Sequence, residues 1–274
     1  MNTVEKKERP VRRLGVMAEC ISGKPGIETL DIIREVGFDC YFTGNTDPKQ
    51  VEALVKRGNE LSMPCEFIHA PFKNINDMWL SGMDYLPIFN AMKRSIDVAY
   101  DNDLPSVTIH VSSGWKAPQV NDLGLARYDA LVEYAIKKNV KLAFENLRKV
   151  GNLACLVDRY ADIEQVGFCY DCGHEHCYTK TVCWPDIFCK KIIETHIHDN
   201  FGRGDDPMGD PDIHLLPFDG DLDYAKMMSK LDEYGYEGAL TLEISNRKRP
   251  DYAEMTPRQF LETAYERLVR ISKM

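Results

Sequence analysis

The sequence has no long apolar run and no cluster of basic residues, and both absences narrow what the protein can be. No stretch of eighteen apolar residues occurs, and the charged start MNTVEKKERPVRR is not followed by the apolar core of a signal peptide. The 34 Lys and Arg residues are outnumbered by 43 Asp and Glu residues, which gives a net charge of −9. This balance disfavours binding to a nucleic-acid backbone. We therefore expect a cytoplasmic protein with neither nucleic-acid nor membrane partners.

A glycine-rich phosphate loop is also missing. The segment ECISGKPG (19–26) follows the first predicted strand but contains neither GxGxxG nor GxxxxGK[ST]. This absence weighs against a doubly wound open sheet, which often carries such a loop after its first strand.

The cysteines do not form a regular framework. Nine are present, an odd number, and several lie in apolar text such as FDCYF and GFCYDC. Buried, reduced thiols explain them better than disulfides. Cys169 and Cys172 form a CxxC pair, but the spacing to Cys177 and Cys183 is irregular, so the zinc signal is weak.

Short apolar or β-branched runs alternate with stretches of helical periodicity from one end of the chain to the other. The predicted strands span 13–20, 38–44, 64–72, 106–112, 141–147, 166–174, 192–200 and 238–245. Asp47 and Thr256, each followed by proline, are predicted to cap the helices that begin after them. Eight β–α units without a linker predict one (β/α)8 TIM barrel over residues 1–274, with a long loop (199–221) after the seventh strand.

Polar side chains collect at the C-terminal ends of the predicted strands, where a barrel carries its active site. They are His69, His110, Glu145, Asp171, His174, His196, His198 and Glu243, with Asp212 and His214 in the long loop. His196 and His198 are two apart, so both project to one side of their strand. Buried charges are costly unless paired or metal-bound, and carboxylates with imidazoles suit a divalent cation. The pattern predicts a metal site, with ion pairs from Glu145 and Glu243 to nearby arginines as the alternative.

Seven motifs follow one another between residues 13 and 245: HAPF, TIHVSSG, AFENL, CYDCGH, HIHDNFGRGD, DIHLLPFDGDLDY and LTLEIS. Their order and spacing resemble the xylose isomerase-like TIM barrels, which include sugar-phosphate isomerases and epimerases, ketose 3-epimerases and endonuclease IV. The sixth motif is similar to the HLPPGxGxID of the sugar-phosphate isomerase/epimerase members, although Phe218 and Asp219 depart from its usual glycine. The set is specific for the superfamily and weak for the substrate.

The resemblance to ketose 3-epimerases implies a single-metal site of Glu145, Asp171, His198 and Glu243. His198 is preferred to His196 because Asp-Asn follows it. Zinc or manganese is the expected metal, with magnesium or cobalt as alternatives. Glu145 and Glu243 are then the expected catalytic bases of an isomerase or epimerase, which moves a proton through an enediolate of a small sugar or sugar phosphate.

The same resemblance leaves two other activities open. Endonuclease IV binds three zinc ions, and further metal or substrate ligands of the required types stand at His69, His110, His174, His196, Asp212 and His214. A multi-zinc phosphodiesterase is therefore one alternative, and a keto-polyol dehydratase using the same metal site is the other. Arg203 is the expected substrate contact at the rim. Dimers are common in such barrels, so a homodimer is an open expectation.

Overall fold

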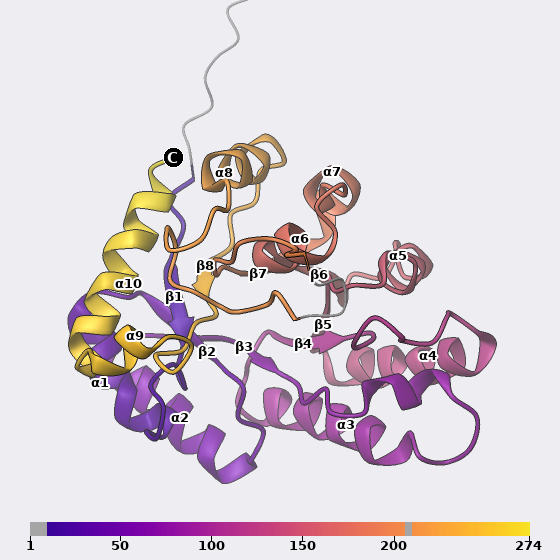
Figure 1. The fold of residues 1–274 in the computed structure, drawn as a ribbon. Coiled ribbons are helices and arrows are strands. Elements are labelled where there is room, and N and C mark those ends of the chain that lie inside the picture. Colours follow the sequence, from indigo (N-terminus) through magenta and orange to yellow (C-terminus); the bar gives the residue numbers. More distant parts are fainter. Residues whose placement is uncertain (1–9, 206–209) are drawn as a thin grey trace, which may run out of the picture.

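The strands form the predicted barrel (Figure 1) in the computed structural model, which describes residues 10–205 and 210–274. Eight parallel strands follow the order β7-β6-β5-β4-β3-β2-β1-β8. They are β1 (Leu14–Met17), β2 (Cys40–Thr43), β3 (Cys65–His69), β4 (Ser106–His110), β5 (Lys141–Glu145), β6 (Val166–Asp171), β7 (Ile192–His196) and β8 (Leu240–Leu242). A parallel bridge between Ile197 and Leu242 completes the ring.

The helices lie around the outside of the strands (Figure 1). They are α1 (Gly26–Val36), α2 (Pro48–Glu60), α3 (Leu86–Asp101), α4 (Asp122–Lys138), α5 (Val150–Arg159), α6 (Cys172–Tyr178), α7 (Trp184–Phe188), α8 (Tyr224–Glu233), α9 (Pro250–Glu254) and α10 (Pro257–Ser272), with 3-10 turns η1 (Ile75–Trp79) and η2 (Cys189–Lys191). Both expected caps are confirmed: Asp47 accepts from the Gln50 amide at 3.0 Å, and Thr256 forms a capping box with Gln259. In the described part of the chain, no helix has the length and apolar character that a membrane crossing requires.

All eight strands are shorter than the predicted runs, and several of them end at the predicted polar residues. β3, β4 and β5 end at His69, His110 and Glu145, and β8 ends one residue before Glu243. The carboxyl ends of parallel strands meet at one end of a barrel. The polar side chains therefore meet there, as expected. The eight cysteines whose side chains the structure describes form no disulfide, in agreement with the reduced thiols expected from their number and setting.

The long segment between β7 and α8, orange in Figure 1, is folded back on the barrel by Asp199. The Asp199 backbone exchanges two hydrogen bonds with Leu215, at 2.9 and 2.8 Å. Its carboxylate accepts from the amides of Phe218 at 2.8 Å and Leu222 at 3.2 Å. One buried aspartate thus holds both ends of the segment, which brings the residues between them to the strand ends. Residues 206–209 of the predicted loop lie outside the described residues.

One helix packs against the barrel rim through a glycine. Gly124 lies in the first turn of α4, and a Cβ at this position would overlap the indole of Trp79. Trp79 cannot easily move away, since it is 2% exposed and its Nε1 donates to the Val111 carbonyl at 2.7 Å. This tryptophan is therefore a packing residue.

We expect Gly124→Ala to destabilise the protein by about 1–3 kcal/mol, because the added methyl overfills this contact. Gly151→Ala is the matched control, since Gly151 also lies near a helix start but has nothing within 4 Å of an added Cβ. Urea unfolding followed by circular dichroism measures both. Equal stabilities of the two variants would contradict the packing argument.

Candidate metal centre

Glu145 is the centre of the polar cluster at the strand ends. Its fully buried carboxylate lies 3.2 Å from His69 Nε2, 2.9 Å from His110 Nε2, 3.2 Å from His174 Nδ1 and 3.1 Å from His196 Nδ1. These imidazoles come from β3, β4, α6 and β7. The alternative of an ion pair between Glu145 and Arg148 is not what the structure shows, because Arg148 pairs with Asp210 at 2.6 Å.

A first group of ligand atoms surrounds Nδ1 of His196. This nitrogen lies 3.1 Å from Glu145, 3.4 Å from Glu243 and 3.9 Å from Asp171, and the four ligand atoms lie within 4.8 Å of one another. The group offers three carboxylates and one imidazole nitrogen as ligands. A divalent cation fits this donor set.

The histidine in this group differs from the one preferred on the resemblance. We expected His198, but the structure groups His196 with Glu145, Asp171 and Glu243. The physical reason is contact with the glutamates: His196 lies 3.1 Å from Glu145 and 3.4 Å from Glu243, whereas His198 pairs with Asp171 and Asp212. His198 lies two residues beyond the end of β7, and its Nε2 lies 3.2 Å from the Asp171 carboxylate.

A second group consists of His174, His198, Asp212 and His214. Asp212 Oδ2 lies 3.1 Å from Nε2 of both His174 and His214, and Asp212 Oδ1 lies 3.6 Å from Nε2 of His198. The Oδ1 atom is buried without a hydrogen-bond partner in the described part of the chain. An unpaired carboxylate oxygen facing imidazole nitrogens is the arrangement that a metal ion completes.

Backbone carbonyls orient two imidazoles of the second group. Nδ1 of His174 donates to the Asn146 carbonyl at 3.0 Å, and Nδ1 of His214 donates to the Glu243 carbonyl at 2.8 Å. In the metal-free protein Nε2 of each ring donates to Asp212, and it is the nitrogen that would bind a metal ion once that proton is lost. This is the pattern by which proteins prepare histidines to bind metals.

A third group joins His69 to Glu145 and His196. Nδ1 of His69 donates to the Ala70 carbonyl at 2.9 Å, which turns its Nε2 toward Glu145. The His110 ring stacks on Phe72 with centroids 4.2 Å apart. All ten predicted metal or ligand residues therefore lie in one connected cluster. The seventh histidine, His176, lies apart and pairs with Asp221 at 2.7 Å.

The electrostatics of the metal-free cluster are set by carboxylates and imidazoles that oppose the effect of burial. Burial alone would raise the pKa of both glutamates, but His110 and His196 hold the pKa of Glu145 well below its usual value, and His196 and His214 bring that of Glu243 to about 2. Conversely, burial would lower the pKa of His196, but Glu243 and Glu145 raise it to about 10. Asp212 and Glu243 likewise raise the pKa of His214 to about 9.

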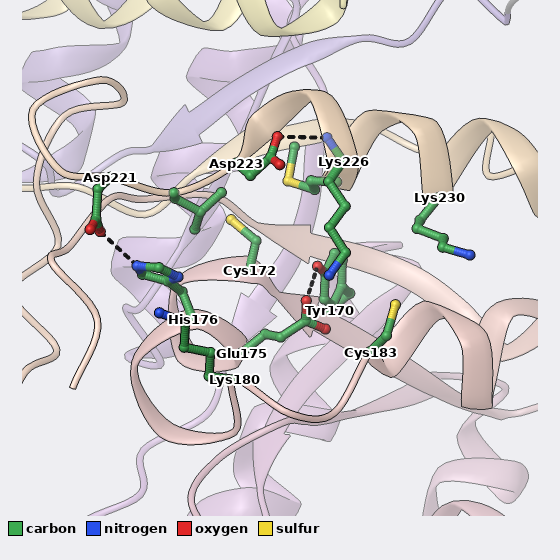
Figure 2. Close-up of a pocket in the computed structure, with 12 residues that line it drawn as sticks. Tyr170, Cys172, Glu175, His176, Lys180, Cys183, Asp221, Asp223, Lys226 and Lys230 are labelled. Atoms are coloured by element: carbon green, nitrogen blue, oxygen red, sulfur yellow. Dashed lines mark hydrogen bonds and ion pairs between the residues drawn. The ribbon is translucent and has the colours of Figure 1, made fainter.

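A cavity of about 380 Å³ opens beside the first group, lined by Met17, Gly44, His69, Ala70, Pro71, Phe72, Lys73 and Glu243. His69 and Glu243 contribute polar groups to its lining, while Met17 and Phe72 contribute apolar surface. A separate cavity of about 320 Å³ between α6 and α8 is shown in Figure 2. It contains the His176–Asp221 pair and none of the ligand residues above. The first cavity is the one that gives a small molecule access to the centre.

Two residues that support the centre were not predicted from the sequence. Asn146 pairs with the backbone of Asp171 through both ends of its amide, at 2.7 and 2.8 Å, and so fixes a ligand of the first group. Gly173 leaves room for the His198 ring, which a Cβ at this position would overlap. Asn146 lies inside the motif AFENL and Gly173 inside CYDCGH, so these motifs could have pointed to both residues.

Comparison with known proteins identifies the family. A model of the family described as xylose isomerase-like TIM barrel matches residues 30–265. An uncharacterised protein of Methanocaldococcus jannaschii is 23% identical over 270 residues, which cover 90% of this chain and 88% of that protein.

Solved structures share the fold at low identity. The IOLI protein with a binding zinc atom is 17% identical with a TM-score of 0.75, and the match covers 95% of this chain and 98% of that one. L-ribulose 3-epimerase is 16% identical with a TM-score of 0.71, and the match covers 96% and 95%. These likenesses show the fold.

We expect metal binding to strengthen as the pH rises from 6 to about 9. His196 and His214 carry protons at neutral pH in the metal-free protein, because their pKa values are about 10 and 9, and a metal ion must displace them. Titration calorimetry with zinc in buffers of different ionisation enthalpy should show proton release at pH 7. His176→Gln should leave the release unchanged, since His176 lies outside the ligand groups. Heats that do not depend on the buffer would contradict the expectation.

Proposed function

This chain belongs to the xylose isomerase-like TIM-barrel family, and we propose that it is a metal-dependent isomerase or epimerase of a small sugar or sugar phosphate. The observation that carries the proposal is the approach of Glu145 and Glu243 to Nδ1 of His196, at 3.1 and 3.4 Å, beside a cavity of small-molecule size. The fold shared with L-ribulose 3-epimerase supports it.

Glu145, Asp171, His196 and Glu243 would hold the ion. A divalent metal bound there polarises neighbouring substrate oxygens and so acidifies the adjacent C–H bond. A carboxylate-rich set suits manganese, magnesium or zinc, with cobalt as a further candidate. Because Lewis-acid chemistry needs no change of the metal's oxidation state, the ligand types and the metals available in the cell would decide which ion binds.

The two glutamates would move the proton. The Glu243 side chain is 17% exposed and lines the cavity, so it reaches the substrate carbon directly. Glu145 is fully buried beside the same Nδ1 of His196, and it would take or return the proton at the second face of the substrate carbon. The low pKa of both groups keeps them ionised, as proton acceptors must be. His69, in the cavity wall, would hold a substrate hydroxyl, and Arg203 would contact the substrate at the rim.

A multi-zinc phosphodiesterase is the second candidate, and the second ligand group is the observation that favours it. His174, His198, Asp212 and His214 supply three imidazoles and a carboxylate, a set that suits tetrahedral zinc. Four protein ligands, however, close a zinc site, and closed sites are typically structural. The excess of acidic residues also disfavours nucleic acid as substrate. A keto-polyol dehydratase would use the first group and lose a hydroxyl beside the same carbanion.

Solvent hydrogen exchange tests the proposed chemistry. Incubated in D2O with a panel of ketoses and keto-polyols, the protein should place deuterium on the carbon next to the carbonyl of its substrate. We expect Glu243→Gln to slow this exchange by about 10²–10⁴-fold, since it removes the proton acceptor in the cavity. Glu254→Gln, at an exposed position of α9, is the control. Unchanged exchange in the Glu243 variant would contradict the assignment of Glu243 as the proton acceptor.

Metal content separates the two candidates. We expect elemental analysis to find about two ions per chain, one in each four-ligand group. His214→Ala should remove one ion and leave deuterium exchange within about tenfold of the original rate, because the second group holds structure and does not move the proton. If the native protein cleaves phosphodiester substrates and His214→Ala abolishes that cleavage, the protein is a phosphodiesterase.

A further inference from the structure

We propose that the substrate ends in a deoxygenated carbon, such as a methyl group, which lies against Met17 and Phe72 in the cavity beside the metal centre. The inference rests on the proposed function, because it names the substrate class of that same site. A 6-deoxy ketohexose has the required form: it carries oxygens at the carbons that react and a methyl group at the other end.

The cavity and the metal centre lie over different parts of the barrel. Three of the four ligands of the first group lie on β5, β6 and β7. The residues that line the cavity lie instead at or shortly after the ends of β8, β1, β2 and β3, which are neighbours in the ring. Glu243 belongs to both sets. A substrate whose oxygens are held at the centre therefore extends its remaining carbons toward Met17, Gly44 and Phe72.

The part of the cavity that does not belong to the centre is mainly apolar. Five of its lining residues offer no polar side chain: Met17, Gly44, Ala70, Pro71 and Phe72. Of the other three, His69 and Glu243 belong to the ligand groups, and Lys73 is exposed. At about 380 Å³ the cavity is near the lower end of the roughly 300–1,000 Å³ typical of ligand pockets, so the substrate is small.

Three backbone positions in this wall have no free donor either. The Gly44 amide donates to the Glu19 carboxylate at 3.2 Å, and the Ala70 amide donates to the Thr108 carbonyl at 3.0 Å. Pro71 has no amide hydrogen. A sugar hydroxyl in this position would lose hydrogen bonds to water without replacing them, and a methyl group avoids that loss.

Phe72 is the largest apolar residue of the lining. One face of its ring stacks on His110, with centroids 4.2 Å apart and an angle of 18° between the planes. Phe72 is nevertheless 46% exposed, so a large part of its ring remains uncovered in the metal-free protein. Covering this surface with C–H groups of a ligand is favourable, and covering it with hydroxyl groups is not.

A phosphate at the same end of the substrate is the competing arrangement. Lys73 is the one basic residue among the described residues that line the cavity. A phosphate presents several acceptor oxygens, and a single exposed lysine supplies few donors for them. The apolar lining therefore favours the methyl group.

Hydrogen exchange with matched substrates tests the inference. The full-length, metal-loaded protein is incubated in D2O with D- and L-ketohexoses, with the 6-deoxy form of each and with the 6-phosphate of each. We expect kcat/KM for exchange to be about 10–100-fold higher for the 6-deoxy form than for its parent ketohexose. An equal or higher value for the parent or for the 6-phosphate would overturn the inference.

A variant of the cavity wall assigns the preference to these residues. Met17→Gln should reduce the preference for the 6-deoxy form by about tenfold, because it brings a hydrogen-bonding group into the wall. Met83→Gln is the matched control, since Met83 is 65% exposed and does not line the cavity. A Met17 variant that keeps the full preference and a normal metal content would show that the methyl group does not lie here.

A second variant decides the matter if Met17→Gln does not fold. Gly44 lines the cavity, and nothing lies within 4 Å of a Cβ added to it, so the fold has room for a side chain at this position. Gly44→Leu should raise KM for the 6-deoxy ketohexose by about tenfold, because it takes up space that the substrate needs. An unchanged KM would contradict binding in this cavity.

The failure of this inference can be told apart from the failure of the proposed function. If the protein binds metal and exchanges deuterium into a ketohexose or its 6-phosphate without preferring the 6-deoxy form, only the apolar end of the substrate is refuted. If it exchanges deuterium into none of the three forms, the proposed function fails together with this inference.

Discussion

The rest of the site depends on one buried carboxylate, that of Glu145, which lies within 3.2 Å of four imidazoles. A fully buried charge without compensation is too costly for a folded barrel, and removing its partners would leave it unpaired. The imidazoles come from β3, β4, α6 and β7, so this requirement connects elements on several sides of the barrel. Protonated histidines satisfy it in the metal-free protein, and a divalent cation satisfies it with fewer protons. Metal binding would therefore also change the electrostatic stability of this end of the barrel.

Around Glu145, hydrogen bonds from side chains to the backbone fix the positions of other ligand residues. Asn146 holds Asp171 through both of its backbone polar groups, and Asp199 folds the long segment so that Asp212 and His214 reach His174. Gly173 leaves the space that the His198 ring fills. Each of these residues positions a ligand residue and is not itself one of the proposed ligands. Their role explains why a segment as long as 199–221 can carry ligands with defined positions.

The eight strands and the polar residues at their ends could be predicted from sequence, because both follow from local patterns: alternation of short apolar runs with helical periodicity, and polar residues placed late in each run. The assignment of His198 rather than His196 to the first group went further than the pattern allowed. A spacing of two places both rings on one side of the strand, but which ring meets Glu145 and Glu243 depends on how β7 is placed relative to β5 and β8, and that placement is a long-range property. The partners of Arg148 could not be predicted either, since Asp210 lies 62 residues away on a segment without regular structure.

The two four-ligand groups differ in a way that separates their chemistry. Three carboxylates and one imidazole favour an ion that takes more than four ligands and so keeps positions open for substrate oxygens. Three imidazoles and one carboxylate favour a four-coordinate ion whose positions are already filled. The groups are nevertheless in contact, because Asp171 of the first lies 3.2 Å from His198 of the second. An ion in the second group would therefore fix His198 and, through it, the carboxylate of Asp171. In this reading the closed group stabilises a ligand of the open one, and the long segment that supplies Asp212 and His214 becomes part of the reaction centre without touching the substrate carbon.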